Sequence, residues 1–317
     1  MRVLLSLAIL LPALCLQACG GRAGYDDGQI YCCGGDKVFL IDVEAARAQP
    51  LAGEPATRPA EFAGLLWSWQ ASDSPQIRPP HRAWFSAMDE CKPVLGGGAV
   101  LVSSSSQGGV ALIRQADKKC LFYAGGRNAH SAELIGTDLL AGAFSYRCDE
   151  LRLYRLSDGP AARPAWTMRL SGAHGVVWDR ARSVLWALGG RELLKLKVHR
   201  PPGQQPSAEV LRRWRLPSGG GHDLFPLDAD RLVVTVNRGV YQFDAQGETF
   251  RPLPSLTRRP RVKSVCRHPA TGTIMYTQGE PTFTNKIRIL AAEPLVLPAE
   301  DLYKARWNVP NRFSYER

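Results

Sequence analysis

The chain repeats a unit of about 40 residues along most of its length, and each unit holds four short β-type runs separated by turn residues. One clear copy begins with HSAELI (130–135) and continues through DLLAGAFSY, ELRLYRL and AWTMRL. The runs are short, rich in Val, Leu, Trp and Tyr, and lack the sustained 3.6-residue period of a helix. A repeat of this length with four strands is typical of a β-propeller blade, so we expect an all-β fold.

The two ends of the chain complete the pattern. Residues 29–70 supply only three runs, and the missing inner strand is expected at 303–309 (YKARWNV). The sequence therefore predicts a six-bladed propeller of four-stranded blades, formed by residues 29–317 as one domain and closed by its C-terminal strand. The Pro-rich segment 71–89 is expected to form a long loop, and the last strand of the sixth unit is weak.

Aligning the units brings a basic or imidazole residue to the start of every inner strand. Successive positions are separated by 38, 44, 48, 41 and 41 residues. Equivalent positions of consecutive blades surround one axis, so we predict a ring at one mouth of the central channel. Its members are Lys92, His130, His174, His222, Lys263 and Lys304. The alternative is a wet channel whose polar residues bind only water.

Loops between the second and third strands of each unit are expected to open on the same face. They supply a polar rim around the ring: Gln107, Tyr146, Arg147, Asn237, Arg238 and Gln278. We include Gln278 and Arg147 with the ring residues among the predicted ligand-binding residues.

The N-terminus reads as a targeting segment. One Arg precedes an apolar stretch of about 13 residues, which is too short for a membrane span. LQAC (16–19) has the form of a bacterial lipobox, although Gln17 is an unusual residue there. We predict a signal peptide over 1–18, lipidation of Cys19 and a tether over 19–28. This would place the protein on a bacterial membrane, facing the periplasm or the cell exterior. Ordinary signal-peptidase cleavage with full release is the alternative.

The net charge is +11, from 40 basic and 29 acidic residues. An exported lipoprotein is a poor partner for nucleic acid, which leaves anionic glycans, lipid headgroups or small acidic molecules. A generally basic surface without a specific partner is the alternative. Export would also permit disulfides among the remaining six cysteines, but their pairing cannot be read from the sequence. We expect a monomer.

Several motifs resemble a group of exported bacterial propellers known as a domain of unknown function. They are DECKPV (89–94), NAHSAEL (128–134), SGAHGVVWD (171–179), GGGHDL (219–224), VKSV (262–265) and LYKARW (302–307). A more distant similarity, in site composition alone, is to oligogalacturonate lyases. Their propellers hold a divalent metal through three His and a Gln. That similarity implies a Mn, Zn or Ca ion on His130, His174 and His222, with Gln278 as a fourth ligand.

These residues support a lyase hypothesis, in which the protein cleaves an acidic, uronate-containing glycan by β-elimination. The reaction needs a cation to neutralise the carboxylate, and a base to remove the neighbouring proton. Lys92 and Lys263 are the candidate bases, since a cationic pocket lowers the pKa of a lysine, and His174 is a third catalytic candidate. The alternatives are a lipoprotein that binds an anionic sugar or metabolite without turnover, and a scaffold for protein interactions.

Overall fold

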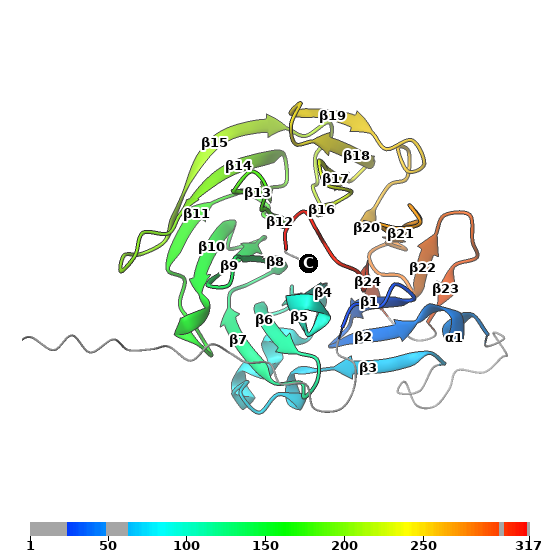
Figure 1. The fold of residues 1–317 in the computed structure, drawn as a ribbon, viewed down its shortest axis with the longest axis horizontal. Coiled ribbons are helices and arrows are strands. Elements are labelled where there is room, and N and C mark those ends of the chain that lie inside the picture. The colour runs from blue at the N-terminus through cyan, green and yellow to red at the C-terminus, as the bar shows by residue number, and fades with distance from the viewer. Residues whose placement is uncertain (1–23, 49–62, 298–300, 316–317) are drawn as a thin grey trace, which may run out of the picture.

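The computed structural model describes residues 24–48, 63–297 and 301–315, and these form six four-stranded antiparallel sheets arranged in a ring (Figure 1). From the innermost strand outward, the first blade consists of β24 (Leu302–Trp307), β1 (Gln29–Gly34), β2 (Lys37–Asp42) and β3 (Leu65–Trp69). The second consists of β4 (Met88–Val94), β5 (Ala99–Ser104), β6 (Gly109–Arg114) and β7 (Cys120–Gly125). The third consists of β8 (Ala129–Ile135), β9 (Leu139–Phe144), β10 (Glu150–Arg155) and β11 (Trp166–Arg169).

The other three blades are β12 (Gly175–Asp179), β13 (Val184–Leu188), β14 (Glu192–His199) and β15 (Ser207–Arg215); β16 (Asp223–Pro226), β17 (Arg231–Val236), β18 (Gly239–Asp244) and β19 (Thr249–Pro252); and β20 (Val262–Arg267), β21 (Ile274–Gln278), β22 (Lys286–Ile289) and β23 (Leu295–Val296). The prediction of six four-stranded blades is confirmed. The last strand of the sixth blade is weak as expected, because β23 has only two residues.

The ring closes through the C-terminal strand. β24 pairs antiparallel with β1, with Cys33 opposite Lys304 and Ile30 opposite Trp307. One blade is thus built from both ends of the chain. This closure leaves each inner strand paired on its outer side and flanked by neighbouring inner strands around the axis.

The burial of a strand depends on its place in the blade. The inner strands β4, β8 and β24 are buried at every position, since one side faces the axis and the other packs between blades. Outer strands such as β11 and β15 are largely exposed and carry charged residues. Apolar clusters fill the spaces between adjacent blades, such as the one around Trp186 and Phe243.

The Pro-rich segment after β3 is more ordered than the predicted loop. It contains two 3₁₀ helices, η1 (Ala71–Asp73) and η2 (Pro79–Phe85). The indole nitrogen of Trp69 donates a hydrogen bond to Ser74, and Phe85 is buried against the second blade. The segment therefore packs onto the propeller and brings Trp84 to its surface.

The C-terminal segment after β24 crosses the middle of the ring (Figure 1). The Arg180 amide donates a hydrogen bond to the Phe313 carbonyl, and Phe313 is buried. At the other end of the chain, the Asp26 amide donates to the carbonyl of Asn308. The predicted signal peptide, Cys19 and the first part of the tether lie outside the described residues.

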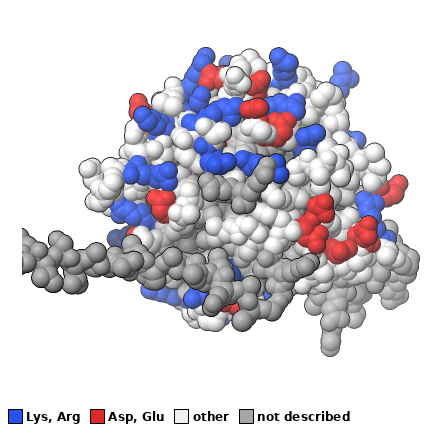
Figure 2. Space-filling view, in the orientation of Figure 1, with Lys and Arg blue, Asp and Glu red and all other residues white. Residues whose placement is uncertain are grey.

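The one α-helix in the described part of the chain, α1 (Val43–Ala48), is short, and no described helix is long and apolar enough to cross a membrane. In the same part, Cys33, Cys91, Cys120, Cys148 and Cys266 form no disulfide. Figure 2 shows Lys and Arg side chains spread over much of the visible face, interrupted by fewer acidic ones, as the net charge of +11 requires.

Candidate functional site

One mouth of the channel is lined by the first axis-facing residue of each inner strand. Four of these six positions are bulges, where one extra residue stands opposite the neighbouring strand. At the other two the residue lies directly before its strand, and its amide still donates to the second strand. The six equivalent residues are Asp89, His130, His174, His222, Lys263 and Tyr303. We call them the mouth cluster.

The predicted ring is therefore correct at four positions and wrong at two. His130, His174, His222 and Lys263 lie at the mouth. Lys304 lies one residue deeper than Tyr303, and Lys92 lies three residues deeper than Asp89. The sequence alignment missed both shifts because it followed basic residues, and in these two blades the mouth position holds Asp89 or Tyr303 instead.

Below the mouth, six charged side chains fill the channel. Each is at most 1% exposed, so water does not reach this layer. We call them the ion network: Lys92, Lys304, Arg306, Glu90, Glu133 and Asp223.

The contacts of the ion network neutralise its three cations. Arg306 donates to Glu90 at 3.0 and 3.2 Å and to Asp223 at 2.6 and 2.9 Å. Lys304 Nζ lies 3.3 Å from Glu90 and 3.1 Å from Asp223. Lys92 Nζ lies 3.2 Å from Glu133. Neither Lys92 nor Lys304 is available to a ligand at the mouth, which removes both from the predicted ligand-binding residues and Lys92 from the candidate bases.

The pKa values of the network's carboxyl groups reflect these contacts. Burial alone would raise the pKa of Glu90, but Arg306, Lys304 and Lys92 hold it well below its usual range. Asp223 likewise has a lowered pKa, because Arg306 and Lys304 outweigh its burial. Burial raises the pKa of Glu133 to about 7 in spite of Lys92. The network is therefore a structural core of the channel.

The three imidazoles of the mouth cluster are held neutral. Burial lowers the pKa of His174 to about 3 and that of His222 to about 4, and Lys263 contributes to both shifts. Burial and the nearby His174 lower the pKa of His130 well below its ordinary value. The cluster therefore presents neutral imidazoles at pH 7.

Hydrogen bonds fix which nitrogen carries the proton in two of these rings. His174 Nδ1 lies 2.8 Å from the Gly172 carbonyl oxygen, so Nδ1 donates and Nε2 is an acceptor. His222 Nε2 lies 2.9 Å from Asn237 Oδ1 and donates to it, which leaves Nδ1 as an acceptor. His222 Nδ1 is buried and has no hydrogen-bond partner among the described residues. The mouth thus offers acceptor atoms to a ligand.

Lys263 is the cation of the mouth cluster. It is 7% exposed and has no salt bridge in the described part of the chain, and its ammonium lies 5.5 Å from the centre of the Tyr303 ring. Burial lowers the pKa of Lys263 to about 8, although Asp89 opposes the shift at longer range. Burial also raises the pKa of Asp89 to about 7, and its Oδ2 has no hydrogen-bond partner among the described residues.

The arrangement does not fit the predicted metal site. The rings of His130 and His174 stack nearly parallel, with centroids 4.1 Å apart and planes at 16°, so their nitrogens do not converge on one point. Within the described ranges, no three His, Cys, Asp or Glu side chains gather as metal ligands. Gln278, the predicted fourth ligand, donates its amide to the Pro260 carbonyl. The proposed function therefore includes no step that uses a metal.

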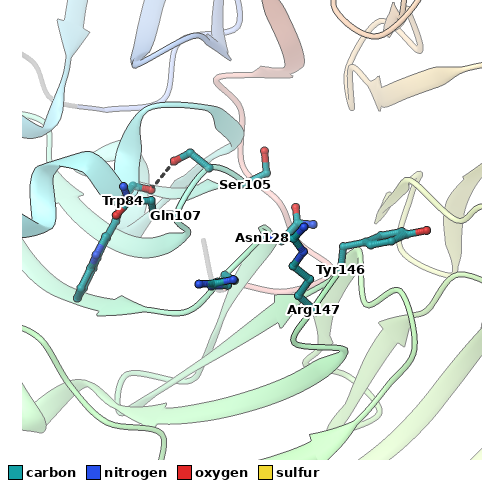
Figure 3. A pocket seen from close by; sticks show the side chains of 8 residues that line it. Trp84, Ser105, Gln107, Asn128, Tyr146 and Arg147 are labelled. Carbon is teal, nitrogen blue, oxygen red and sulfur yellow. Dashed lines mark hydrogen bonds between the residues drawn. The ribbon is translucent and has the colours of Figure 1, made fainter.

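Beside the mouth cluster lies an open pocket of about 780 Å³, which we call the mouth pocket (Figure 3). Trp84 stands on one side, Arg147 and Tyr146 on the other, and Ser105 and Asn128 between them. Gln107 and Arg127 also line it, and Tyr146 is 76% exposed. Arg127 and Arg147 form no ion pair in the described part of the chain.

Short links join the mouth pocket to the mouth cluster. Ser105 is close enough to Asp89 to lower the pKa of its carboxyl group, and the Ser145 hydroxyl, next to Tyr146, lies 3.2 Å from His174 Nδ1. The Asn128 carbonyl accepts from the Ser145 amide. A ligand in the pocket would therefore adjoin the histidines.

Two residues that line the mouth pocket have positive φ angles. Asn128 has φ 59° and Arg147 has φ 73°, in the left-handed region that residues other than glycine rarely adopt. Arg261, two residues before Lys263, has φ 57°. Seven other described non-glycine residues also have positive φ, so these angles mark tight turns and do not single out the site.

The remaining predicted rim residues are dispersed. Gln107, Tyr146 and Arg147 meet in the mouth pocket, and Asn237 reaches the cluster through His222. Arg238 sits in the turn between β17 and β18, away from the pocket's lining. Sequence reasoning missed Asp89, Tyr303, Trp84 and Arg127. Two of these residues were within reach of the sequence, since Asp89 opens the motif DECKPV and Tyr303 directly precedes Lys304 in LYKARW.

Comparison with known proteins agrees with the fold. A model of a family of unknown function, DUF6528, matches residues 8–317. None of the curated proteins matches the chain in sequence. Among solved structures it is similar to the β-propeller domain of Myceliophteria thermophila Cps50 (Swd1), with a TM-score of 0.53 and 14% identity over 90% of this chain and 83% of that one. The WD40 domain of Neurospora crassa Pan2 gives 0.51 and 10%, over 90% and 78%. These likenesses show the propeller fold alone.

Proposed function

The chain belongs to the family of unknown function DUF6528, and we propose that its mouth cluster and mouth pocket together bind an acidic carbohydrate. The observation that carries the proposal is that three cations without an acidic partner in the described part of the chain, Lys263, Arg127 and Arg147, belong to one mouth. Inside the channel, the three cations of the ion network are all paired with carboxylates.

The other lining groups suit a sugar. Trp84, whose ring stacks on His81, adds apolar surface to the pocket wall beside the arginines, and an apolar sugar face can contact it. Asn128, Gln107 and Ser105 offer hydrogen bonds to hydroxyl groups. His222 Nδ1 and Asp89 Oδ2, which are buried without partners, accept hydrogen bonds from hydroxyls that reach the mouth. The arginines pair with the sugar carboxylate, since a guanidinium matches that group with two parallel hydrogen bonds.

Binding is tested by calorimetric titration of the purified protein with galacturonate oligosaccharides and with neutral oligosaccharides of the same length. Arg147→Asn removes the cation and keeps a side chain that tolerates a positive φ. It should weaken binding of the acidic ligand about tenfold, while Arg169→Ala, on the exposed outer strand β11, should leave binding unchanged. Equal affinity for acidic and neutral ligands would overturn the acidic specificity, and no binding of either would favour a scaffold for other proteins.

Lys263 favours a second candidate function, a lyase reaction on the same ligand. With its lowered pKa, a fraction of Lys263 is neutral near pH 7 and can take the proton from the carbon next to the carboxylate. The electron pair of that C–H bond then forms a C=C bond as the glycosidic C–O bond breaks. The leaving oxygen takes a proton from the Tyr303 hydroxyl, and the arginines stabilise the charge that builds on the carboxylate.

The pH dependence separates the two candidates. Anion binding through Lys263 needs the ammonium, so it weakens as pH rises through about 8. Proton abstraction needs the free amine, so the rate of appearance of ultraviolet-absorbing unsaturated product increases over the same range. Binding without any such product supports the carbohydrate-binding protein alone.

We also propose that the protein acts outside the bacterial cytoplasm, held by a lipid on Cys19. The support is the apolar segment and the LQAC motif of the N-terminus. Cys19→Ala should release the protein from the membrane fraction, and retention of this variant there would contradict the anchor.

A further inference from the structure

The opposite mouth of the channel holds another cavity, of about 230 Å³, which we call the lower pocket. Its walls are the ends of the inner strands and the C-terminal segment that crosses the ring. Phe225, Trp307 and Phe313 give it an apolar interior. The ion network fills the channel between the two mouths, so this pocket has no connection to the mouth cluster through the axis.

The C-terminal wall of the lower pocket is held in place by local hydrogen bonds. The Asn311 side chain accepts from the Phe313 amide at 3.1 Å and donates to Ser314 Oγ at 3.1 Å. The Tyr315 amide donates to the Asn311 carbonyl at 2.9 Å. The wall is thus a folded turn with fixed side chains.

Two polar groups of the wall, the Trp307 indole nitrogen and the Tyr315 hydroxyl, have no hydrogen-bond partner among the described residues. The indole nitrogen of Trp307 is buried and makes no hydrogen bond with any described residue, and the whole side chain is 7% exposed. The His268 ring packs edge-on against the Trp307 ring, with 5.1 Å between their centroids, and makes no hydrogen bond to the indole N–H. Buried donors are rarely left without an acceptor, and the Trp307 side chain lines the lower pocket, where a ligand could supply one.

The charges around the lower pocket favour an anionic acceptor. Arg267 and Arg312 line it, and neither forms an ion pair in the described part of the chain. Asp228, the acidic residue of the lining, is already engaged by Arg231 through a 2.8 Å hydrogen bond. The ammonium of Lys92 is likewise occupied by Glu133.

We propose that the lower pocket is a second ligand site, which takes a small carboxylate with an apolar or aromatic body. The carboxylate accepts from the Trp307 indole N–H and pairs with Arg267 and Arg312, while the body packs against Phe225 and Phe313. The volume corresponds to about seven or eight waters, which limits the ligand to a single ring or a short chain. This site is independent of carbohydrate binding at the other mouth.

The test is a titration of the ¹⁵N-labelled protein with phenylacetate, followed through the indole N–H signal of Trp307. Trp307→Phe assigns that signal by its disappearance. We expect phenylacetate to shift the signal with saturation, and 2-phenylethanol, the neutral analogue, to bind at least tenfold more weakly. Arg312→Gln should weaken phenylacetate about tenfold, and Arg169→Ala should have no effect.

Two results would overturn the inference. One is a Trp307 signal that does not move at the solubility limit of phenylacetate, and the other is an equal response to the acid and the alcohol. Titration with galacturonate oligosaccharides provides a further control, because they should leave the Trp307 signal in place whether or not they bind at the mouth pocket.

Discussion

The imidazole rings of His130 and His174 stack at 4.1 Å between centroids in the mouth of the propeller, with Lys263 as the cation of the same cluster. Burial disfavours protonation of both rings, and the nearby His174 adds to the effect on His130. The mouth therefore concentrates its positive charge on one lysine and uses the imidazoles as neutral hydrogen-bonding groups.

Lys263→Met should stabilise the protein while removing function. The lowered pKa means that the folded state binds the lysine proton less well than the unfolded state does. The charged lysine is therefore destabilising below pH 8, and stability recovers as pH rises from about 8 toward 10.5. We expect a gain of about 1–3 kcal/mol at pH 7 by urea denaturation, together with a loss of acidic-glycan affinity. A destabilised variant would contradict the buried, unpaired charge.

The mouth histidines should make the fold sensitive to mild acid. Their folded pKa values lie below 6.5, so the unfolded state takes up more protons as pH falls from about 6.5 to 4, and stability is lost over that window. Asp89 and Glu133 have raised pKa values and act in the opposite direction, but they are two groups against three. His222→Gln should reduce the acid-induced loss by about 1–3 kcal/mol between pH 6.5 and 4, measured by urea denaturation. An unchanged pH profile would show that His222 titrates normally.

Arg306→Met should destabilise the fold strongly. Arg306 bridges Glu90 and Asp223, and its loss leaves two fully buried carboxylates with only Lys304 and the more distant Lys92 to offset them. Breaking such a buried group costs about 3–5 kcal/mol. Arg213→Ala, which breaks an exposed pair with Glu192, should cost less than about 1 kcal/mol and serves as the control in the same denaturation assay. Comparable losses in both variants would mean that the ion network is not the core of the channel.

Metal analysis tests the three-histidine hypothesis directly. Because the rings of His130 and His174 are stacked rather than convergent, we expect less than one equivalent of zinc or manganese in the purified protein. Chelator treatment should leave thermal stability and glycan binding unchanged. One equivalent of metal, lost in His174→Ala, would restore the metal site and require the rings to rearrange.

Blade count and ring closure were predictable because their signals are local. Each blade carries its own four apolar runs and turns, and the missing inner strand of residues 29–70 left a gap that only YKARWNV fills. The depth of each axial residue was harder to predict. The alignment followed basic residues, and in two blades the mouth position holds Tyr303 or Asp89, so it took a lysine one or three residues further along the strand.

The sequence by itself determined the propeller, its closure and the gathering of His130, His174, His222 and Lys263 at one mouth, because equivalent positions of a repeat meet around a common axis. Only the tertiary structure decided which basic residues are available there. Lys92 and Lys304 belong to the ion network because each forms an ion pair with a carboxylate from another blade, Glu133 or Asp223, in a buried part of the channel. Such partners are about 40 and 80 residues away in the chain, so their pairing depends on distances that exist only after the ring has closed.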